Sequence, residues 1–589
     1  MKLKLSIKYL LSDLWSHIDP VRRKQFVFLL VMMVLVSLLE IFSIGAVLPF
    51  INVLTSPERI FGLASAQIFI RLFGITTSAQ LQFFITIAFG FTVLTTCFMR
   101  LLLLWANAKL SYAIGSDISI SIYQRTLYQP YAIHCERNSS EIINGVISKS
   151  SGAITIINYC INILSAGVML LFILIALLAI TPFGVLVVFI GFAGIYIAII
   201  YLARKKLLDY SQSMAFESTY LIKSLQEGLG GIRDILINGS QVIYCQIYEK
   251  SDRIFRRAQG NTLFISSSPR YIMETLGIII VSIWVYLLSR ESFGIVKATP
   301  IIATVVLGVQ RLLPIMQQAY AAWTGILSSQ TSLQDTLKLL NQPLPEYLRQ
   351  LTSKPLPFNR NISLKGISFR YTSKLPYVLK EVNFNIKKGS RVGFIGPTGS
   401  GKSTLLDIIM CLLQPTDGKL EIDGQTLNSS NQRSWQMHIA HVPQNIFLVD
   451  STIEENIAFG VQKNKINFKR VRQSAKQAQI DDYIQNLPQQ YKTFVGERGI
   501  RLSGGQRQRI GIARALYNKA DVIIFDEATS ALDDKTEKDL IQAIEKLSKD
   551  LTILIIAHRY TTLKNCSHIF ECSNKTIKRK SYNLIRKGS

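Results

Sequence analysis

Charged residues are scarce in this 589-residue sequence, and acidic residues are scarcer than basic ones. Asp, Glu, Lys and Arg together supply 17% of the residues, whereas hydrophobic residues supply 49%. Disordered and fibrous chains have other compositions, so those classes are excluded. Lys and Arg number 65 against 38 Asp and Glu, which gives a net charge of +27. This basic excess fits either nucleic-acid binding or a membrane protein with basic cytoplasmic loops.

Cysteine is rare, and its pattern excludes two further kinds of site. The seven cysteines are scattered, and no pair has the spacing of a zinc site or a disulfide framework. We expect them to be small buried hydrophobic side chains. A cleaved signal peptide is not expected either, because the first apolar stretch is too long and lacks a small-residue cleavage site.

Long apolar stretches dominate the first half of the sequence. A membrane-spanning helix needs about 20 mostly apolar residues. Six stretches fit, near Phe26–Ile51, Leu81–Trp105, Ile154–Ile180, Phe183–Ala203, Ile272–Ser289 and Ile301–Leu327. They predict an α-helical polytopic membrane domain with six transmembrane helices. Lys and Arg gather before the first stretch and after the fourth, so the positive-inside rule places both termini in the cytoplasm. This distribution explains much of the charge without nucleic acid.

The connections between these stretches differ in length. Residues 106–153 and 204–271 are long and helix-patterned, so we expect the spans to continue into the cytoplasm as long helices. Each connection is predicted to reverse at a short helix, near Cys135–Glu141 and near Leu229–Asp234. A Pro-punctuated polar linker then follows at 341–360. Beyond the linker, short β-branched runs alternate with helical patterns, as they do in P-loop α/β domains. The predicted domains are therefore a membrane domain at 1–340 and an α/β P-loop NTPase domain at 361–589.

A glycine-rich motif at 396–403, GPTGSGKS, follows the apolar strand Arg391–Ile395 and precedes a helical segment. This is the context of a Walker A loop, whose backbone N–H groups hold phosphates. Lys402 would reach the β- and γ-phosphates, and Ser403 would bind Mg²⁺. The predicted ATP-binding residues of this loop are Gly396, Thr398, Gly399, Ser400, Gly401, Lys402, Ser403 and Thr404.

Two carboxylates follow the apolar run Val522–Phe525. Asp526 is predicted to hold the metal ion, and Glu527 is predicted to act as the general base that activates the attacking water. An apolar strand that ends in Asp-Glu is a weak signal alone, but it gains weight from the Walker A loop.

The pentapeptide Leu502-Ser503-Gly504-Gly505-Gln506 matches the signature of ATP-binding cassette (ABC) proteins, and the whole second half of the chain resembles them. The resemblance implies adenine stacking for Tyr371, a Q-loop role in catalysis and metal binding for Gln444, and a catalytic switch role for His558. It also places an X-loop at Gly496–Gly499 and a D-loop at Ser530–Asp533. Tyr371 could instead be an ordinary strand aromatic, Gln444 a surface residue and His558 a structural histidine.

One membrane domain followed by one cassette resembles the half-transporters among type IV ABC exporters. The resemblance implies a homodimer in which Ser503, Gly504, Gly505 and Gln506 of one subunit complete the ATP site of the other, with ATP and Mg²⁺ as cofactors. It further implies an ATP-hydrolysing translocase of the inner membrane whose termini and ATPase domains are cytoplasmic.

The cargo is suggested by ionisable residues in or near the spans, which are costly there and often mark a pathway. Arg100, Arg270 and Arg311 would suit an anionic headgroup such as a pyrophosphate. The alternative is that these arginines form ion pairs inside the membrane domain, for example with Glu40 or Glu274. Segments 39–51, 269–274 and 311–314 resemble bacterial flippases for lipid-linked oligosaccharides, and so does Pro57–Gly74, which matches their external helix. An ordinary interfacial helix is the alternative for that last segment.

The leading hypothesis is therefore an ABC flippase of a lipid-linked oligosaccharide or related glycolipid, with membrane lipid and an anionic lipid-linked substrate as partners and no nucleic acid. A multidrug, lipid or peptide exporter is the alternative within the class. A soluble cassette ATPase acting on nucleic acid and an ATP-gated channel are the alternatives outside it. The final segment, Cys566–Ser589, departs from the family because it is basic and lacks a glycine turn, so the pattern does not predict a final strand pair.

Overall fold

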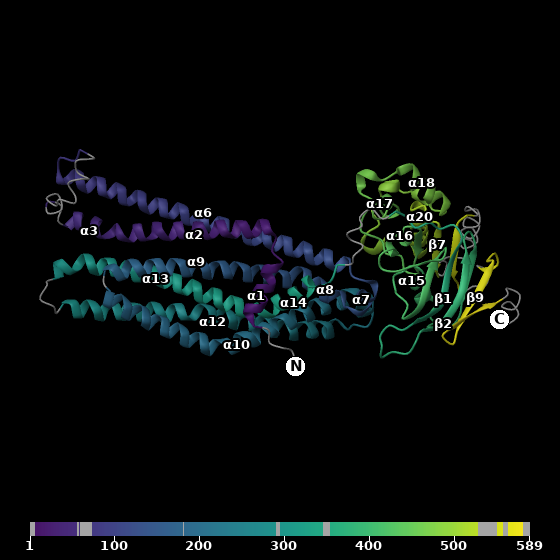
Figure 1. Ribbon diagram of the computed structural model, residues 1–589, viewed down its shortest axis with the longest axis horizontal. Helices are drawn as coiled ribbons and strands as arrows, with labels where there is room; N and C mark the ends of the chain where they lie inside the picture. The colour runs from purple at the N-terminus through teal and green to yellow at the C-terminus, as the bar shows by residue number, and fades with distance from the viewer. Residues whose placement is uncertain are drawn as a thin grey trace. The chain divides into compact units, whose positions relative to one another are not determined.

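The computed structural model describes residues 6–55, 58, 74–180, 182–289, 295–344, 354–527, 550–557 and 563–580. The chain divides into two compact units (Figure 1). The helical unit comprises Met1–Tyr128 and Arg137–Pro343, and the cassette unit comprises Gln129–Glu136 and Leu344–Ser589. The short segment Gln129–Glu136 is thus grouped with the cassette although it lies within the helical half of the sequence.

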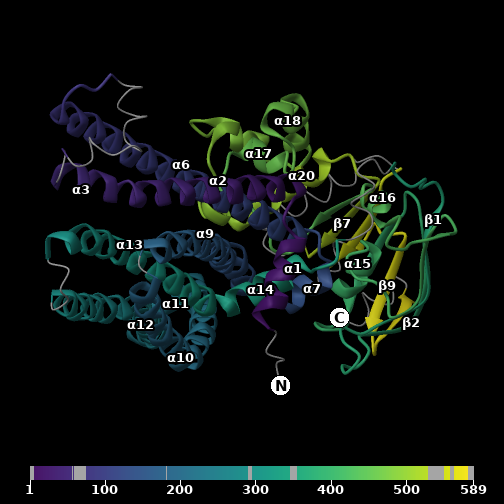
Figure 2. The same ribbon diagram turned by 60° about the vertical axis from the view of Figure 1, so that its left-hand side comes forward.

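The helical unit consists of long helices that lie side by side in both views (Figures 1 and 2). Its elements are α1 (Ile7–Ser16), α2 (Pro20–Gly45), α3 (Val47–Thr55), α6 (Ser78–Leu127), α8 (Ser139–Asn144), the π-helix η1 (Gly145–Lys149), α9 (Ser150–Ile180), α10 (Pro182–Gly230), α11 (Ile232–Ile237), α12 (Gln241–Ser289), α13 (Ile295–Ser328) and α14 (Gln330–Leu340). The helix α7 (Tyr131–Glu136) belongs to the cassette unit.

Five of the six predicted apolar stretches each lie within one helix of this unit, namely α6, α9, α10, α12 and α13. The first stretch is divided between α2 and α3, which are separated at Ala46. Among the described residues, the segments Pro20–Ser43, Ser78–Leu127 and Ser139–Ala176 are long and apolar enough to cross a membrane. Thr77 caps the N-terminus of α6, because its side chain accepts a hydrogen bond from the backbone N–H of Gln80.

The helices α6, α10 and α12 span 50, 49 and 49 residues, as expected for spans that continue well beyond a bilayer. The first long connection reverses at α7 and α8, and the second reverses at α11. These short helices lie within a few residues of the predicted positions, so both predicted reversals are confirmed.

Small residues allow the helices to approach closely. A Cβ atom added to Gly325 of α13 would lie 1.9 Å from the ring of Tyr159 on α9, and one added to Gly115 of α6 would lie 2.3 Å from Ile154. The helix α9 therefore packs against both α13 and α6, while α10 packs against α12. Buried Ile114, Ile156 and other apolar side chains form a core beside these contacts.

The described part of the cassette unit contains two sheets. A four-stranded sheet has the order β2-β1-β4-β5, and a six-stranded sheet has the order β10-β9-β3-β8-β7-β6. The strands are β1 (Asn361–Phe369), β2 (Leu379–Lys387), β3 (Arg391–Ile395), β4 (Asp417–Ile422), β5 (Gln425–Thr426), β6 (Ile439–Val442), β7 (Val522–Asp526), β8 (Thr552–Ile556), β9 (His568–Ser573) and β10 (Thr576–Lys580). All neighbouring strands from β9 to β6 in the six-stranded sheet are parallel.

Helices cover this sheet, and their packing positions the site. They include α15 (Lys402–Ile409), α16 (Gln432–Gln436), α17 (Ile453–Ile457), α18 (Phe468–Gln477), α19 (Asp481–Gln485) and α20 (Gly504–Tyr517). The apolar strands are buried on both faces, which is the usual state of a parallel sheet between helix layers. The predicted α/β P-loop architecture is therefore present.

The basic final segment does form a strand pair, although the sequence pattern did not predict one. The strand β10 pairs antiparallel with β9 through a turn at Asn574 and Lys575. Both residues have positive φ values, 49° and 65°, so they adopt the left-handed conformation that a glycine turn usually supplies. Asparagine tolerates this conformation better than most residues do, which explains how the turn forms without glycine.

Candidate ATP site and membrane cavity

The Walker A loop connects β3, which lies between β8 and β9, to the start of α15. Its three glycines have positive φ values of 146° at Gly396, 81° at Gly399 and 95° at Gly401. A Cβ atom at Gly396 would lie 2.3 Å from the carbonyl oxygen of Cys572 on β9. The loop thus needs glycine for its backbone conformation and, at Gly396, also for close approach to the neighbouring strand.

The loop residues fit a polyphosphate. The Lys402 side chain is buried, and its ammonium donates to the carbonyl oxygens of Gly396 at 2.8 Å and Pro397 at 3.0 Å. Because an ammonium has three N–H donors, one remains for a ligand oxygen. The hydroxyl of Ser400 is buried without a hydrogen-bond partner within the described part of the chain. Phosphate oxygens would satisfy both groups, and the N-terminus of α15 adds positive potential.

The two predicted carboxylates lie at the end of β7, one strand from β8 and two strands from β3. Asp526 and Ser403 share a side-chain hydrogen bond, which favours the ionised carboxylate. Burial and the neighbouring Glu527 outweigh this effect and raise the pKa of Asp526. This chemistry fits Mg²⁺, a cation that prefers carboxylate and hydroxyl oxygens and that would neutralise charge on the phosphates when bound.

Glu527 contacts a residue from a different strand. The side-chain amide of Gln444, which follows β6, donates a hydrogen bond of 2.6 Å to the Glu527 carboxylate. Glu527 has a φ of 49°, and its backbone N–H donates to the carbonyl of Ile556 on β8. The Q-loop residue and the predicted general base are thus held together at the same edge of the sheet, where a water molecule could be positioned for attack.

Asp407 is a member of this site that the sequence did not reveal. It lies one turn after Ser403 on α15, and burial together with the charge of Asp526 raises its pKa to about 6. The spacing of four residues from a predicted Mg²⁺ ligand was the available signal, because residues i and i+4 share a helix face. Asp407 therefore adds a third titratable carboxyl group to Asp526 and Glu527.

Tyr371 lies two residues beyond the end of β1 rather than within the strand. Its hydroxyl is 3.0 Å from the hydroxyl of Thr404 on α15, and its ring packs edge-on against Phe369. The side chain is 47% exposed, so part of it is accessible to a ligand. This placement next to the Walker A helix agrees with an adenine-stacking role.

The signature residues form the N-terminus of α20. The Ser503 side chain accepts a hydrogen bond from the backbone N–H of Gln506, and the Gln506 side chain accepts one from the backbone N–H of Ser503. This capping box leaves Gly504 and Gly505 in the first helical turn, where backbone N–H groups attract anions. In the X-loop, Gly496 and Gly499 both have positive φ values.

Some predicted residues lie outside the described part of the chain. These are His558, the D-loop residues Ser530–Asp533 and nearly all of the segment Pro57–Gly74. The structure therefore leaves their predicted roles as predictions.

Two of the three membrane-domain arginines form ion pairs. Arg100 of α6 lies 2.5 Å from the carboxylate of Glu40 on α2, whose side chain is fully buried. Arg270 forms an ion pair of 2.7 Å with Glu274 one turn along α12, and both side chains are well exposed. Both pairs agree with the alternative interpretation, in which these arginines form ion pairs inside the membrane domain. Arg311 lies on α13, but its side chain is outside the described part.

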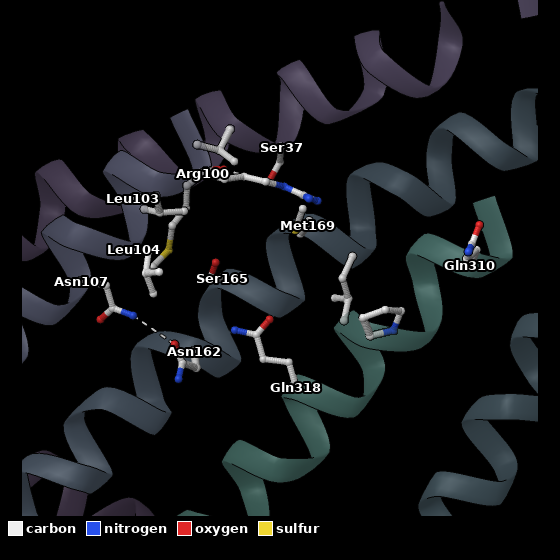
Figure 3. Close-up of a pocket in the computed structure, with 14 residues that line it drawn as sticks. Ser37, Arg100, Leu103, Leu104, Asn107, Asn162, Ser165, Met169, Gln310 and Gln318 are labelled. Atoms are coloured by element: carbon white, nitrogen blue, oxygen red, sulfur yellow. Dashed lines mark hydrogen bonds between the residues drawn. The ribbon is translucent and has the colours of Figure 1, made fainter. Parts of the chain in front are cut away.

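A cavity of about 320 Å³ lies among α2, α6, α9 and α13 in the helical unit (Figure 3). Its described lining combines apolar side chains with Arg100, two serines and four carboxamides. These polar residues are Ser37, Arg100, Asn107, Asn162, Ser165, Gln310 and Gln318. Arg100, although paired with Glu40, thus lies at the wall of a cavity whose described lining mixes polar and apolar side chains. The sequence signalled this cavity only through Arg100, an ionisable residue within an apolar stretch.

Comparison with known proteins identifies the family. The sequence profile described as ABC transporter matches residues 379–530. Over 474 residues, the chain is 30% identical to the ATP-dependent lipid A-core flippase of Saccharophagus degradans, and the alignment covers 78% of each protein. This chain is an ABC transporter.

Two further comparisons concern the fold of the whole chain and the sequence of a part of it. A solved structure of a bacterial Atm1-family ABC exporter with ATP bound superposes with a TM-score of 0.78 over 97% of each chain at 21% identity, which shows a shared fold. The leukotoxin translocation ATP-binding protein LktB of a Pasteurella haemolytica-like species is 38% identical over 271 residues, which cover 46% of the transporter. The transporter's match covers only 37% of LktB. The predicted fold class, a helical membrane domain fused to an ABC ATPase domain, is confirmed.

Proposed function

We propose that the transporter hydrolyses ATP to move a lipid-linked oligosaccharide or a related glycolipid across the cytoplasmic membrane. The proposed working unit is a homodimer with its termini and cassettes in the cytoplasm. The observation that carries the choice of cargo is the polar cavity among the membrane-domain helices, which Arg100 lines. A purely apolar drug or lipid tail would not require seven polar side chains there.

The proposed hydrolysis assigns one task to each group of cassette residues. Lys402, Ser400 and the loop glycines hold the phosphates, while Tyr371 stacks on the base. Ser403, Asp526 and Gln444 hold Mg²⁺. Glu527 accepts the proton of the attacking water, and Gln444 positions that carboxylate through the 2.6 Å hydrogen bond. His558 is proposed to stabilise charge on the transferred phosphoryl group.

The proposed dimer follows from the position of the signature residues. Ser503 to Gln506 begin a helix whose first-turn amides suit a phosphate, and Ser503 itself is exposed. In the proposed closed state, these residues of one subunit bind the nucleotide held by the Walker A loop of the other. ATP binding would then favour the dimeric closed state, and hydrolysis would release it.

The proposed cargo has a lipid tail and an anionic headgroup. A guanidinium binds phosphate oxygens through paired N–H donors, so Arg100, Arg270 and Arg311 are proposed to meet the phosphate of the cargo along its path. The similarity to a lipid A-core flippase over most of the chain supports a glycolipid cargo. Similarity to a toxin-translocating protein covers less than half of the chain, so a peptide or drug exporter is the second candidate.

The test is reconstitution of the purified full-length protein in proteoliposomes that contain a polyprenyl-pyrophosphoryl oligosaccharide. We expect ATP to change the fraction of saccharide that an external glycosidase can reach, and we expect the Glu527→Gln variant to abolish this change. Stimulation of the ATPase by peptides or apolar drugs, with no movement of the glycolipid, would instead support the second candidate.

A further inference from the structure

The cavity shown in Figure 3 has, beside apolar side chains, a set of neutral polar side chains that a phosphate site does not explain. Among its described lining residues Arg100 is the only cation, and the buried Glu40 offsets its charge. Phosphate oxygens only accept hydrogen bonds, so further arginines or lysines would be expected if the cavity bound phosphate alone. Instead, four carboxamides and two hydroxyl groups line it.

These polar groups come from separate helices, and helical spacing directs them to one space. On α13, Gln310, Pro314 and Gln318 recur every four residues and so share one face. On α9, Asn162 and Ser165 are three residues apart, which also places them on one face. In Figure 3 the side chain of Gln318 extends toward Asn162 and Ser165, while Gln310 lies farther along α13.

One asparagine holds another in place. The side-chain amide of Asn107 donates a hydrogen bond of 3.0 Å to the carboxamide oxygen of Asn162, and the oxygen of Asn107 accepts one from Ser111. Asn107 thus uses one of its two N–H donors to hold the oxygen of Asn162, whereas both N–H donors of Asn162 have no partner within the described part of the chain. Within the described part of the chain, the carboxamides of Gln310 and Gln318 form no hydrogen bond to protein groups.

Carboxamides carry both donors and acceptors, and so does a sugar hydroxyl group. A set of carboxamides on different helices therefore matches a polyhydroxylated group better than an anion. Asn107 follows Arg100 by seven residues on α6, which corresponds to about 10 Å along the helix axis. A group that binds at the carboxamides thus lies close to a phosphate held by Arg100. The cavity, at about 320 Å³, is at the small end of ligand pockets, which fits only a part of a large glycan.

We infer that Asn162, Gln310 and Gln318 bind the hydroxyl groups of the saccharide units adjacent to the phosphate of the cargo, and that Asn107 positions Asn162. This inference rests on the proposed function, because it assigns a part of the proposed cargo to the cavity. It adds a specificity determinant: the transporter distinguishes a glycosylated carrier from a bare one by neutral hydrogen bonds rather than by charge.

The test compares two probes, polyprenyl pyrophosphate and the same carrier with a disaccharide attached. Equilibrium binding of each probe to the full-length protein is measured in detergent by microscale thermophoresis without ATP. We expect the wild-type protein to bind the glycosylated carrier more tightly. Gln318→Ala and Asn162→Ala should each reduce that affinity by about two- to tenfold, as expected for the loss of a neutral hydrogen bond, and should change the affinity for the bare carrier much less.

Gln317→Ala is the matched control. Gln317 is the next residue on α13, but its carboxamide donates to the backbone of Ser266 and accepts from Tyr196, away from the cavity. This variant should leave the ratio of the two affinities unchanged. Equal wild-type affinity for both carriers, or an equal loss of both affinities in Gln318→Ala, would overturn the inference and leave the proposed function intact. Binding of neither carrier would overturn the proposed function as well.

Discussion

Removing Arg100 should destabilise the protein more than neutralising its ion-pair partner Glu40. The Glu40 side chain is fully buried, whereas that of Arg100 is 38% exposed at the cavity wall. Arg100→Ala would remove the cation that lies 2.5 Å from a buried carboxylate. Removing one partner of a buried pair costs about 3–5 kcal/mol, because the remaining charge lies in a poorly solvated place.

Glu40→Gln should cost less. Glutamine keeps an acceptor for the guanidinium, and the charge of Arg100 can reach water in the cavity, so the loss is that of one charge-assisted hydrogen bond, about 1.5–3 kcal/mol. The double variant Arg100→Met with Glu40→Gln carries neither charge. It should be more stable than Arg100→Ala alone, because replacing a whole buried ion pair is often close to neutral.

The assay is thermal unfolding of the detergent-purified protein for the wild type, both single variants and the double variant. The expected order of stability places Arg100→Ala last and the double variant above it. The Arg270→Ala variant serves as control, because its i,i+4 pair with Glu274 is exposed to screening by solvent and should contribute little to stability. If Arg100→Ala were no less stable than Glu40→Gln, or if the double variant were the least stable of all, the reasoning from burial would be refuted.

Three further predictions concern the cassette and the cargo path. Glu527→Gln should retain ATP binding but lower ATPase turnover by about 100-fold or more, since a positioned base contributes at least that much; near-normal turnover would exclude Glu527 as the base. Asp407 has a raised pKa of about 6, so the folded state binds its proton more tightly than the unfolded state, and this carboxyl lowers stability increasingly as the pH rises from about 4 to 6. Asp407→Asn should therefore raise the melting temperature at pH 7.5 but not at pH 3.5–4, and an equal change at both values would contradict the assignment. Arg311→Ala should reduce substrate-stimulated ATPase activity more than basal activity, whereas an equal reduction of both would make Arg311 structural.

The sequence predicted those parts of the molecule in which a local motif determines the geometry. The Walker A loop needs glycines where φ is positive, and its context between a strand and a helix was readable from Arg391–Ile395 and the following residues. Helical periodicity and length likewise predicted α6, α10 and α12 and the reversals near α7 and α11.

Features that depend on contacts between distant segments could not be predicted from the sequence. Asn107 and Asn162 are 55 residues apart in the sequence, and only the packing of α6 against α9 brings their carboxamides to 3.0 Å. Asp407 of α15 and Asp526 of β7 are likewise far apart in the sequence, and their interaction depends on the fold. The β9–β10 pair was missed because Asn574 and Lys575 adopt left-handed conformations for which the sequence offered no glycine.

The measurement that tests the central claim most directly is native mass spectrometry of the Glu527→Gln variant after incubation with ATP and Mg²⁺. The proposed mechanism requires two chains to hold two nucleotides between a Walker A loop and a signature motif from opposite subunits. It predicts a complex of two chains with two bound ATP molecules. A single chain, or a pair of chains without nucleotide, would contradict it.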